Sequence, residues 1–206
     1  MSKQSFKYKT KFVQPIIASC DLDEETYRVS IASSLDELKK IIPSSINLER
    51  NIDLSAVAFN GAVVNKFNKN HDGIDSESAV AIKDYFVHKP TNIEHKKQRI
   101  VGHIVSAGFS EYATNNILSD EEARNLNVPY NLAFGAVVYR MVDRDFANLI
   151  AESADQESSY YKQISASWEI GFNDYQIALG SEDLSQAELI TDSSQVREFS
   201  KYLRAN

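Results

Sequence analysis

The chain has 206 residues, 43% of them hydrophobic and 25% charged, a composition that excludes wholesale disorder and allows a core without disulfides or metals. Its 22 basic and 29 acidic residues give a formal charge of −7, which argues against nucleic acid as a direct partner. The single cysteine excludes an internal disulfide, and no apolar run is long enough to cross a membrane. We therefore expect a globular protein of a reducing compartment that does not work at a membrane.

The first 52 residues contain one clear helix signal. Ser34 and Glu37 have the spacing of a capping box and precede Leu38 and Ile41. We interpret residues 1–52 as an N-terminal segment, which is either a propeptide or an extension packed on the rest of the chain. Residues 53–206 then form the main domain, which ends in a C-terminal helix.

Five later segments have the composition of β-strands, and amphipathic helices lie between them. The strand segments are rich in β-branched and aromatic residues: 56–64, 100–109, 133–139, 163–170 and 175–179. Gly-Phe-Asn-Asp at residues 171–174 predicts a hairpin turn that joins the last two. Helices are predicted after Ser76, after Ser119, around Phe146 and around Phe199. Because a hairpin favours antiparallel pairing, we expect an α+β fold with a mostly antiparallel β-barrel or sheet surrounded by helices.

The strand segment 163–170 alternates strictly and offers a serine nucleophile. Its two-residue period puts Ile164, Ala166, Trp168 and Ile170 on one face, and Ser165, Ser167 and Glu169 on the other. The apolar face indicates a core contact. The polar face is either a solvated surface or a rigid platform for a nucleophile, and a serine on it would need a base.

The candidate base is His95. It follows Pro90 and precedes the apolar run that begins at Ile100, so we expect it at a loop-to-strand edge, where an imidazole is ordered yet accessible. A solvated surface histidine is the alternative interpretation. Among the other histidines, His103 reads as structural and His71 as a turn residue. No metal or cofactor is expected, because His-x-x-x-His spacing and Gly-rich phosphate loops are both absent.

Three motifs follow one another between residues 56 and 179. An Asn-rich loop after a strand occupies residues 59–70, Lys-Pro-Thr-Asn-Ile-Glu-His at 89–95 precedes Val-Gly-His-Ile at 101–104, and Ile-Ser-Ala-Ser-Trp occupies 164–168. In this order they resemble the motifs of the prohead core proteases of tailed phages, which carry out head maturation. The His motif is fairly specific because it combines Pro, Asn and the Glu-His pair, whereas the Ser motif is short.

The resemblance implies a fold similar to that of herpesvirus assembly proteases, an antiparallel β-barrel surrounded by helices. It also implies a serine endopeptidase that acts on phage scaffold and major capsid proteins, and on itself, in the host cytoplasm inside the assembling procapsid. Ser165 corresponds to the nucleophile and His95 to the general base. An acidic residue should orient the histidine; Glu188 is preferred, and the alternatives are Asp183, Asp192 and Glu169.

Several alternatives remain open at this point. Ser167 is the rival nucleophile, one strand repeat from Ser165. A non-catalytic structural or scaffold protein of the virion with a protease-like fold is the second hypothesis for function, since a fold alone does not prove its chemistry. An α/β-hydrolase is disfavoured because the Gly-x-Ser-x-Gly elbow is absent. Whether the protein forms a homo-oligomer is also left open.

Overall fold

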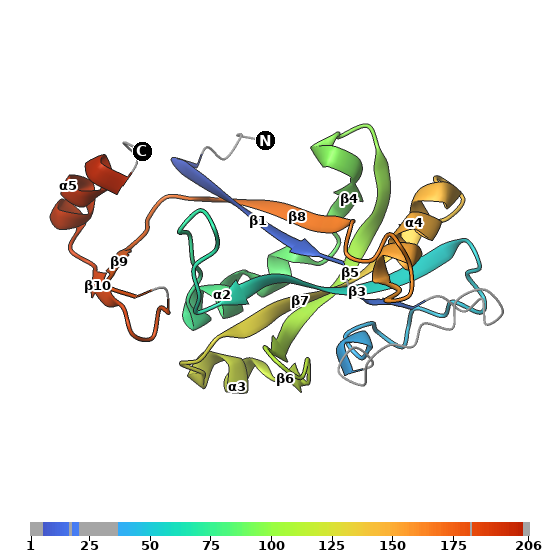
Figure 1. Cartoon of the computed structure of the whole chain (residues 1–206), viewed down its shortest axis with the longest axis horizontal. Coiled ribbons are helices and arrows are strands. Elements are labelled where there is room, and N and C mark those ends of the chain that lie inside the picture. The colour runs from blue at the N-terminus through green and yellow to red at the C-terminus, as the bar shows by residue number, and fades with distance from the viewer. Residues whose placement is uncertain (1–5, 17, 21–36, 182, 204–206) are drawn as a thin grey trace.

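A curled antiparallel sheet, close to half of a barrel, forms the body of the protein (Figure 1). The computed structural model describes residues 6–16, 18–20, 37–181 and 183–203. In it, the strand order of this sheet is β2-β3-β7-β5-β4, and β6 pairs with β5. The strands are β2 Ala18–Cys20, β3 Leu54–Val64, β4 Pro90–Asn92, β5 Ile100–Glu111, β6 Ile117–Leu118 and β7 Tyr130–Tyr139. The predicted α+β class and antiparallel pairing are thereby confirmed.

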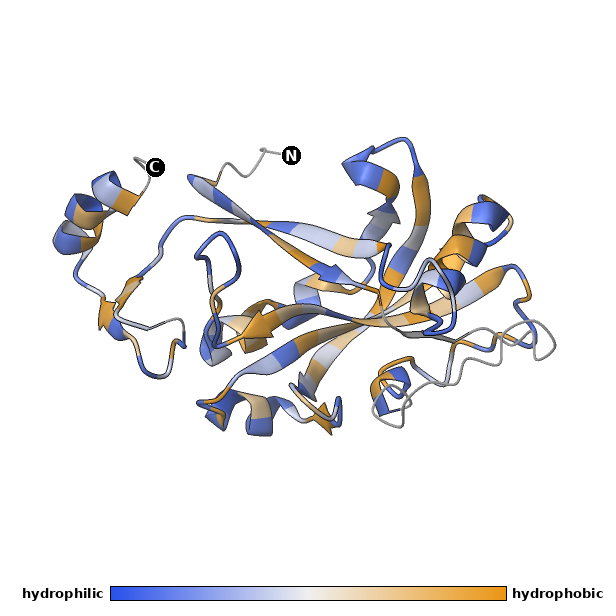
Figure 2. Cartoon of the chain, in the orientation of Figure 1, coloured by the Kyte–Doolittle hydropathy of each residue, from blue (hydrophilic) through white to orange (hydrophobic). Residues whose placement is uncertain are grey.

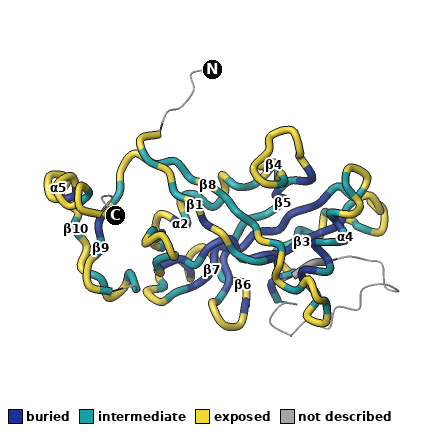
Figure 3. Tube along the Cα trace, turned by 45° about the horizontal axis from the view of Figure 1, so that its top comes forward, coloured by how far each residue is buried: buried dark blue, intermediate teal, exposed yellow. Residues whose placement is uncertain are grey.

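The core lies around β3 and β7, which are the darkest strands in Figure 3. Nine of the ten residues of β7 are buried, so this strand is apolar on both faces. Its central Phe134 is 2% exposed and contacts the rings of Phe59 and Phe86. In Figure 2 orange, hydrophobic residues recur along β3 and β7, in line with the strong sequence signals for these strands.

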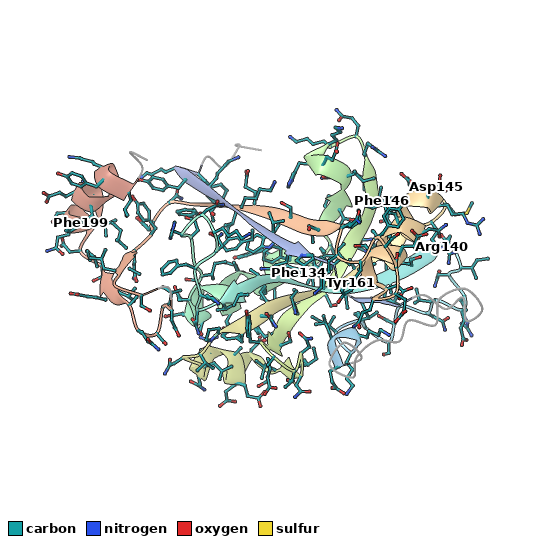
Figure 4. All side chains as sticks on the ribbon, viewed as in Figure 1. Phe134, Arg140, Asp145, Phe146, Tyr161 and Phe199 are labelled. Atoms are coloured by element: carbon teal, nitrogen blue, oxygen red, sulfur yellow. The ribbon has the colours of Figure 1, made fainter. Side chains whose placement is uncertain are left out.

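A two-stranded ribbon lies over this sheet and is made of β1 Tyr8–Pro15 and β8 Ser165–Phe172. The two strands pair antiparallel along all eight residues, from Tyr8 opposite Phe172 to Pro15 opposite Ser165. Phe12 stacks on Trp168 with ring centroids 4.5 Å apart, and the Trp168 indole N–H donates to the Gly61 carbonyl at 3.0 Å. Trp168 also meets Phe134, which Figure 4 labels in the interior. Aromatic contacts therefore attach the ribbon to the body.

Among the described residues the helices are few and short, and a ring of helices around the sheet stays a prediction. Besides a short helical segment at 37–39, they are α2 Ser76–Ile82, α3 Asp120–Asn125, α4 Arg144–Ala154 and α5 Ser193–Leu203, with 3-10 turns η1 Lys83–Phe86 and η2 Ile93–His95. The capping box of Ser119 and Glu122 is confirmed, whereas α2 is capped by Asp75, whose carboxylate accepts the Ser78 N–H at 2.8 Å, and not by Ser76. The predicted cap at Ser34 lies outside the described residues. Within the described part of the chain, no helix is both long and apolar enough to cross a membrane.

The predicted hairpin between residues 163–170 and 175–179 is wrong. β9 Ile177–Leu179 pairs with β10 Glu188–Ile190, and β8 pairs with β1. β1 offers an eight-residue ladder and the Phe12 ring, whereas β9 is only three residues long. β9, β10 and α5 form a separate unit at the end of the molecule opposite α4 (Figure 1). The division at residues 52 and 53 stays a prediction; in the described part of the N-terminal segment, β1 pairs with β8 and β2 with β3.

Candidate active site

The loop that carries His95 has a tightly determined conformation. It leaves β4, passes through η2 and re-enters the sheet at β5, and it is closed by an Ile93 N–H to Arg99 carbonyl bond of 3.2 Å. Glu94 and His95 have φ angles of 53° and 58°, in the left-handed region that non-glycine residues avoid. Such a conformation costs on the order of 1–3 kcal/mol per residue and is typical of functional sites. Two adjacent residues of the His95 loop therefore hold a backbone conformation that costs local stability.

Gly102 explains part of the Val-Gly-x-Ile motif that follows this loop. It lies opposite Thr91 of β4 and Val138 of β7. A Cβ atom at this position would lie 2.0 Å from the Val137 carbonyl oxygen and 3.0 Å from the Thr91 hydroxyl. A larger residue would therefore push apart the strands that support the His95 loop.

The structure brings His95 to Ser167. The Nε2 atom of His95 lies 3.1 Å from Ser167 Oγ, which is hydrogen-bond distance and the geometry required of a base and its nucleophile. Ser167 is half-buried in β8, between Ala166 and Trp168, which pack against the core. The serine is thus held on a strand whose other face is fixed by packing, while His95 stays exposed.

The other two predicted residues do not join this pair. Ser165 is exposed on the same face of β8, one strand repeat before Ser167, and the described part of the chain shows no hydrogen bond from it to His95. Glu188 begins β10, in the unit with α5, whereas β4 lies across the molecule (Figures 1 and 3). Asp192 lies in the same distant unit, just before α5, and its side chain accepts from the Ser194 and Gln195 N–H groups. The assignments of Ser165 and Glu188 stay predictions from the resemblance.

Glu169 is the acidic candidate that lies close to the pair. It follows Ser167 by two residues on the same face of β8, and its Oε1 accepts a hydrogen bond from Lys9 Nζ of β1 at 2.7 Å. This bond is the main cause that lowers the pKa of Glu169, and the charges of His95 and Lys11 lower that pKa further. The bond from Lys9 therefore favours the ionised form of Glu169.

Two other histidines lie away from this pair. His103 Nδ1 lies 2.8 Å from the Tyr139 hydroxyl, and His71 has a φ of 60° in a turn closed by its N–H bond to Asn68. Among the described residues, no group of three or more His, Cys, Asp or Glu side chains is arranged to hold a metal ion.

The outer edge of β8 exposes main-chain groups beside the serine. Pro15, which has no N–H, lies opposite Ser165, and the Ile16 N–H donates to the Ile164 carbonyl at 2.9 Å. Because hydrogen-bonded and non-hydrogen-bonded pairs alternate in an antiparallel ladder, the even-numbered residues of β8 bond to β1. The N–H and C=O groups of Ser165, Ser167 and Glu169 then face the other edge. Within the described residues β8 has no partner strand on that side.

A hollow of about 260 Å³ lies apart from the His95 loop and does not coincide with the site. Its walls come from the start of α2, the end of α3 and the segment before β10, including Asn65, Ser76, Leu126 and Leu184. Asn65 is 5% exposed and donates to the Leu126 carbonyl and the Ser76 hydroxyl, so its polar groups are used inside the protein. We assign no chemistry to this hollow.

Sequence reasoning missed the contribution of β1. The strand places Lys9 against Glu169 and Val13 opposite Ser167. A signal was present, because Tyr8, Thr10 and Phe12 alternate with two lysines in the two-residue period of a strand. The basic character of the segment drew attention away from this strand signal.

Comparisons with protein-family models, curated proteins and solved structures found no match for this chain. The site is therefore defined by its own geometry. Its parts are the hydrogen bond between His95 and Ser167, the ionised Glu169, and the free edge of β8.

Proposed function

We propose that the protein is a serine endopeptidase that processes the scaffold and major capsid proteins of a tailed phage, and itself, inside the assembling procapsid. The observation that carries the chemistry is the 3.1 Å approach of His95 Nε2 to Ser167 Oγ. The assignment to head maturation rests on the resemblance of residues 89–95, 101–104 and 164–168 to the prohead protease motifs. The curled antiparallel sheet is compatible with a fold similar to that of herpesvirus assembly proteases, and we include this likeness in the proposal.

In the proposed reaction, Ser167 is the nucleophile and His95 the general base. An unassisted serine hydroxyl attacks a peptide carbonyl poorly, so His95 Nε2 takes the Ser167 proton as the Oγ–C bond forms. The histidine then gives this proton to the leaving amine as the C–N bond breaks. Water hydrolyses the resulting ester, with His95 again acting as the base. This assignment moves the nucleophile one strand repeat from Ser165, and the experiment below tests both serines.

Glu169 is the acidic group that we propose for the site. An imidazolium forms when His95 accepts a proton, and a nearby carboxylate stabilises it. The hydrogen bond from Lys9 favours the ionised form of Glu169, and the charge of His95 lowers the pKa of Glu169 further. Glu188, which the resemblance favours for this role, begins the short strand β10 and remains the alternative.

The free edge of β8 suits an extended peptide. A substrate strand that pairs with it would use the outward main-chain groups of Ser165, Ser167 and Glu169, as in other complexes where a peptide adds to a sheet edge. Its carbonyl would then lie beside the Ser167 hydroxyl. Main-chain pairing of this kind supports an endopeptidase over a hydrolase of small esters.

The test is intact-mass spectrometry of the full-length protein, alone and with its candidate scaffold protein. Ser167→Ala and His95→Ala should lower the rate of self-trimming and of scaffold cleavage by at least about a thousand-fold, as expected when a nucleophile or its base is lost. Ser165→Ala is the matched control, because it removes the same hydroxyl from the same face of β8. It should retain most of the activity.

The possible outcomes separate the assignments. Loss of cleavage in Ser165→Ala alone would keep the protease class and return the nucleophile to Ser165. Loss of cleavage in Glu188→Gln but not in Glu169→Gln would assign the role of orienting acid to Glu188. Absence of cleavage by the wild-type protein on itself and on the scaffold would favour the non-catalytic structural protein of the virion.

A further inference from the structure

The N-terminal strand β1 places an apolar side chain directly beside the proposed nucleophile. Val13 lies opposite Ser167 in the ladder between β1 and β8. The Ile16 N–H bonds to the Ile164 carbonyl and Pro15 has no N–H, so the even-numbered residues of β8 form the hydrogen-bonded pairs with β1. Val13 and Ser167 are therefore a non-hydrogen-bonded pair. In such pairs the Cα atoms are about 4.5 Å apart and the two side chains project from the same face of the sheet.

Val13 is an exposed aliphatic residue in a paired strand. Its exposed fraction is 54%, whereas that of its neighbour Phe12, which points into the core, is 3%. Pro15 and Lys11 flank Val13 on the same outer face, so the valine forms a small apolar area bounded by a positive charge. Nothing in the packing of the described residues requires an aliphatic side chain at this point.

A group attached to Ser167 Oγ can extend across the outer face of the ribbon as far as Val13. The Cβ atoms of directly opposite residues are about 4.5–5.5 Å apart, which is within the reach of one side chain. His95 approaches the same hydroxyl, so an acyl group that reacts there lies near both the imidazole and the valine. Contact with an apolar substituent would remove apolar surface of both from water.

We propose that Val13 is a specificity-determining residue: the side chain next to the scissile carbonyl extends from the substrate strand at the free edge of β8 across Ser167 to Val13, which favours an apolar one. The inference rests on the proposed function and deepens it. The occupant is an extended peptide segment with an aliphatic or aromatic residue at that position. The N-terminal strand is then part of the substrate-binding surface, so the active protein must retain it.

Serine-directed phosphonates test this proposal without a known substrate. In the reaction, the bond from Ser167 Oγ to phosphorus forms, the bond from phosphorus to fluorine breaks, fluoride leaves, and His95 accepts the serine proton. Two reagents are used, a methyl and a long-chain alkyl fluorophosphonate, and intact-mass spectrometry gives a labelling rate constant for each. The ratio of the long-chain to the methyl rate measures the preference for an apolar substituent.

Val13→Thr should lower this ratio by about five-fold, because one methyl group in contact with the alkyl chain becomes a hydroxyl. The threonine keeps the shape and strand preference of valine, and the fluorescence of Trp168, the single tryptophan of the chain, checks that β8 is still in place. Val142→Thr is the matched control, since Val142 is also exposed, at 62%, but lies in the turn before α4. Its ratio should equal that of the wild type.

Each remaining outcome contradicts a different statement. A wild-type protein labelled at Ser167, with an unchanged ratio in Val13→Thr, would overturn the inference and leave the proposed function intact. Peptide mapping that places the label on Ser165 would also overturn it, because Pro15 and not Val13 lies opposite that serine. A wild-type protein that neither reagent labels would overturn the proposed function and this inference with it.

Discussion

β7 and β8 show two ways in which this chain uses a strand. β7 lies at the centre of the curled sheet and nine of its ten residues are buried, whereas β8 has no fully buried residue and packs on one face only. The packed face of β8, with Trp168 at its middle, attaches the ribbon to the body. The other face carries Ser165, Ser167 and Glu169, which no packing requirement holds to a particular residue type. Stability therefore resides mainly in β7, and the chemistry that we propose resides on the outer face of β8.

The largest effect that we expect comes from truncating the centre of β7. Phe134→Ala should lower the free energy of unfolding by about 4 kcal/mol, because the ring is 2% exposed and its loss leaves a cavity between Phe59, Phe86 and Trp168. Urea unfolding followed by circular dichroism measures this change. Val128→Ala, at a position that is 57% exposed, is the control and should change stability by less than about 0.5 kcal/mol. A decrease in the free energy of unfolding below about 1 kcal/mol for Phe134→Ala would contradict the inference that stability resides mainly in β7.

A smaller effect should come from the ribbon. Phe12→Ala removes a buried ring that stacks on Trp168. It should lower the free energy of unfolding by about 3 kcal/mol, less than Phe134→Ala, because the ribbon packs against the body on one face only. Phe12→Ala should also shift the fluorescence emission of Trp168 to longer wavelength, since the indole becomes more exposed to water. Phe6→Ala, at a position that is 41% exposed, should do neither. An unchanged emission in Phe12→Ala would mean that β1 does not hold β8 in place.

The smallest effect concerns the charges on the outer face. Lys9→Met should raise the pKa of Glu169 towards its ordinary value, because the hydrogen bond from Lys9 is the main cause of the depression. A carboxyl group with a lowered folded-state pKa stabilises the fold above its unfolded-state pKa, and this contribution is lost as the pH falls through the folded-state value. The wild type should therefore exceed Lys9→Met in urea midpoint near neutral pH and lose this advantage in acid.

Two measurements check this prediction about Glu169. A carboxyl-carbon NMR titration follows its pKa directly in the wild type and in Lys9→Met. Lys7→Met, which removes the charge just before β1 without touching the ion pair, serves as the control. An equal pKa of Glu169 in the wild type and in Lys9→Met would show that the pair does not form in solution.

Much of the fold was predictable from the sequence alone because its signals are local. β3, β5 and β7 are long runs of β-branched and aromatic residues, and strict alternation in 163–170 separated a core face from a polar face. The capping box at Ser119 is a four-residue pattern and formed as expected. The position of His95 at the edge of a strand followed in the same way from Pro90 and from the start of β5.

Only the tertiary structure decided which partners these elements meet. The partner of β8 is β1, which lies 150 residues or more away in the sequence, and not the nearby residues 175–179, because pairing depends on the length and aromatic contacts of the competing strands. Ser165 and Ser167 have the same local pattern, so the choice between them depends on where the left-handed turn at Glu94 and His95 aims the imidazole. Glu188 and Glu169 differ in the same way: strand pairing places Glu188 in β10, whereas Glu169 lies on β8, two residues after Ser167, and pairs with Lys9. Such relations between distant segments arise from packing, and no short stretch of sequence encodes them.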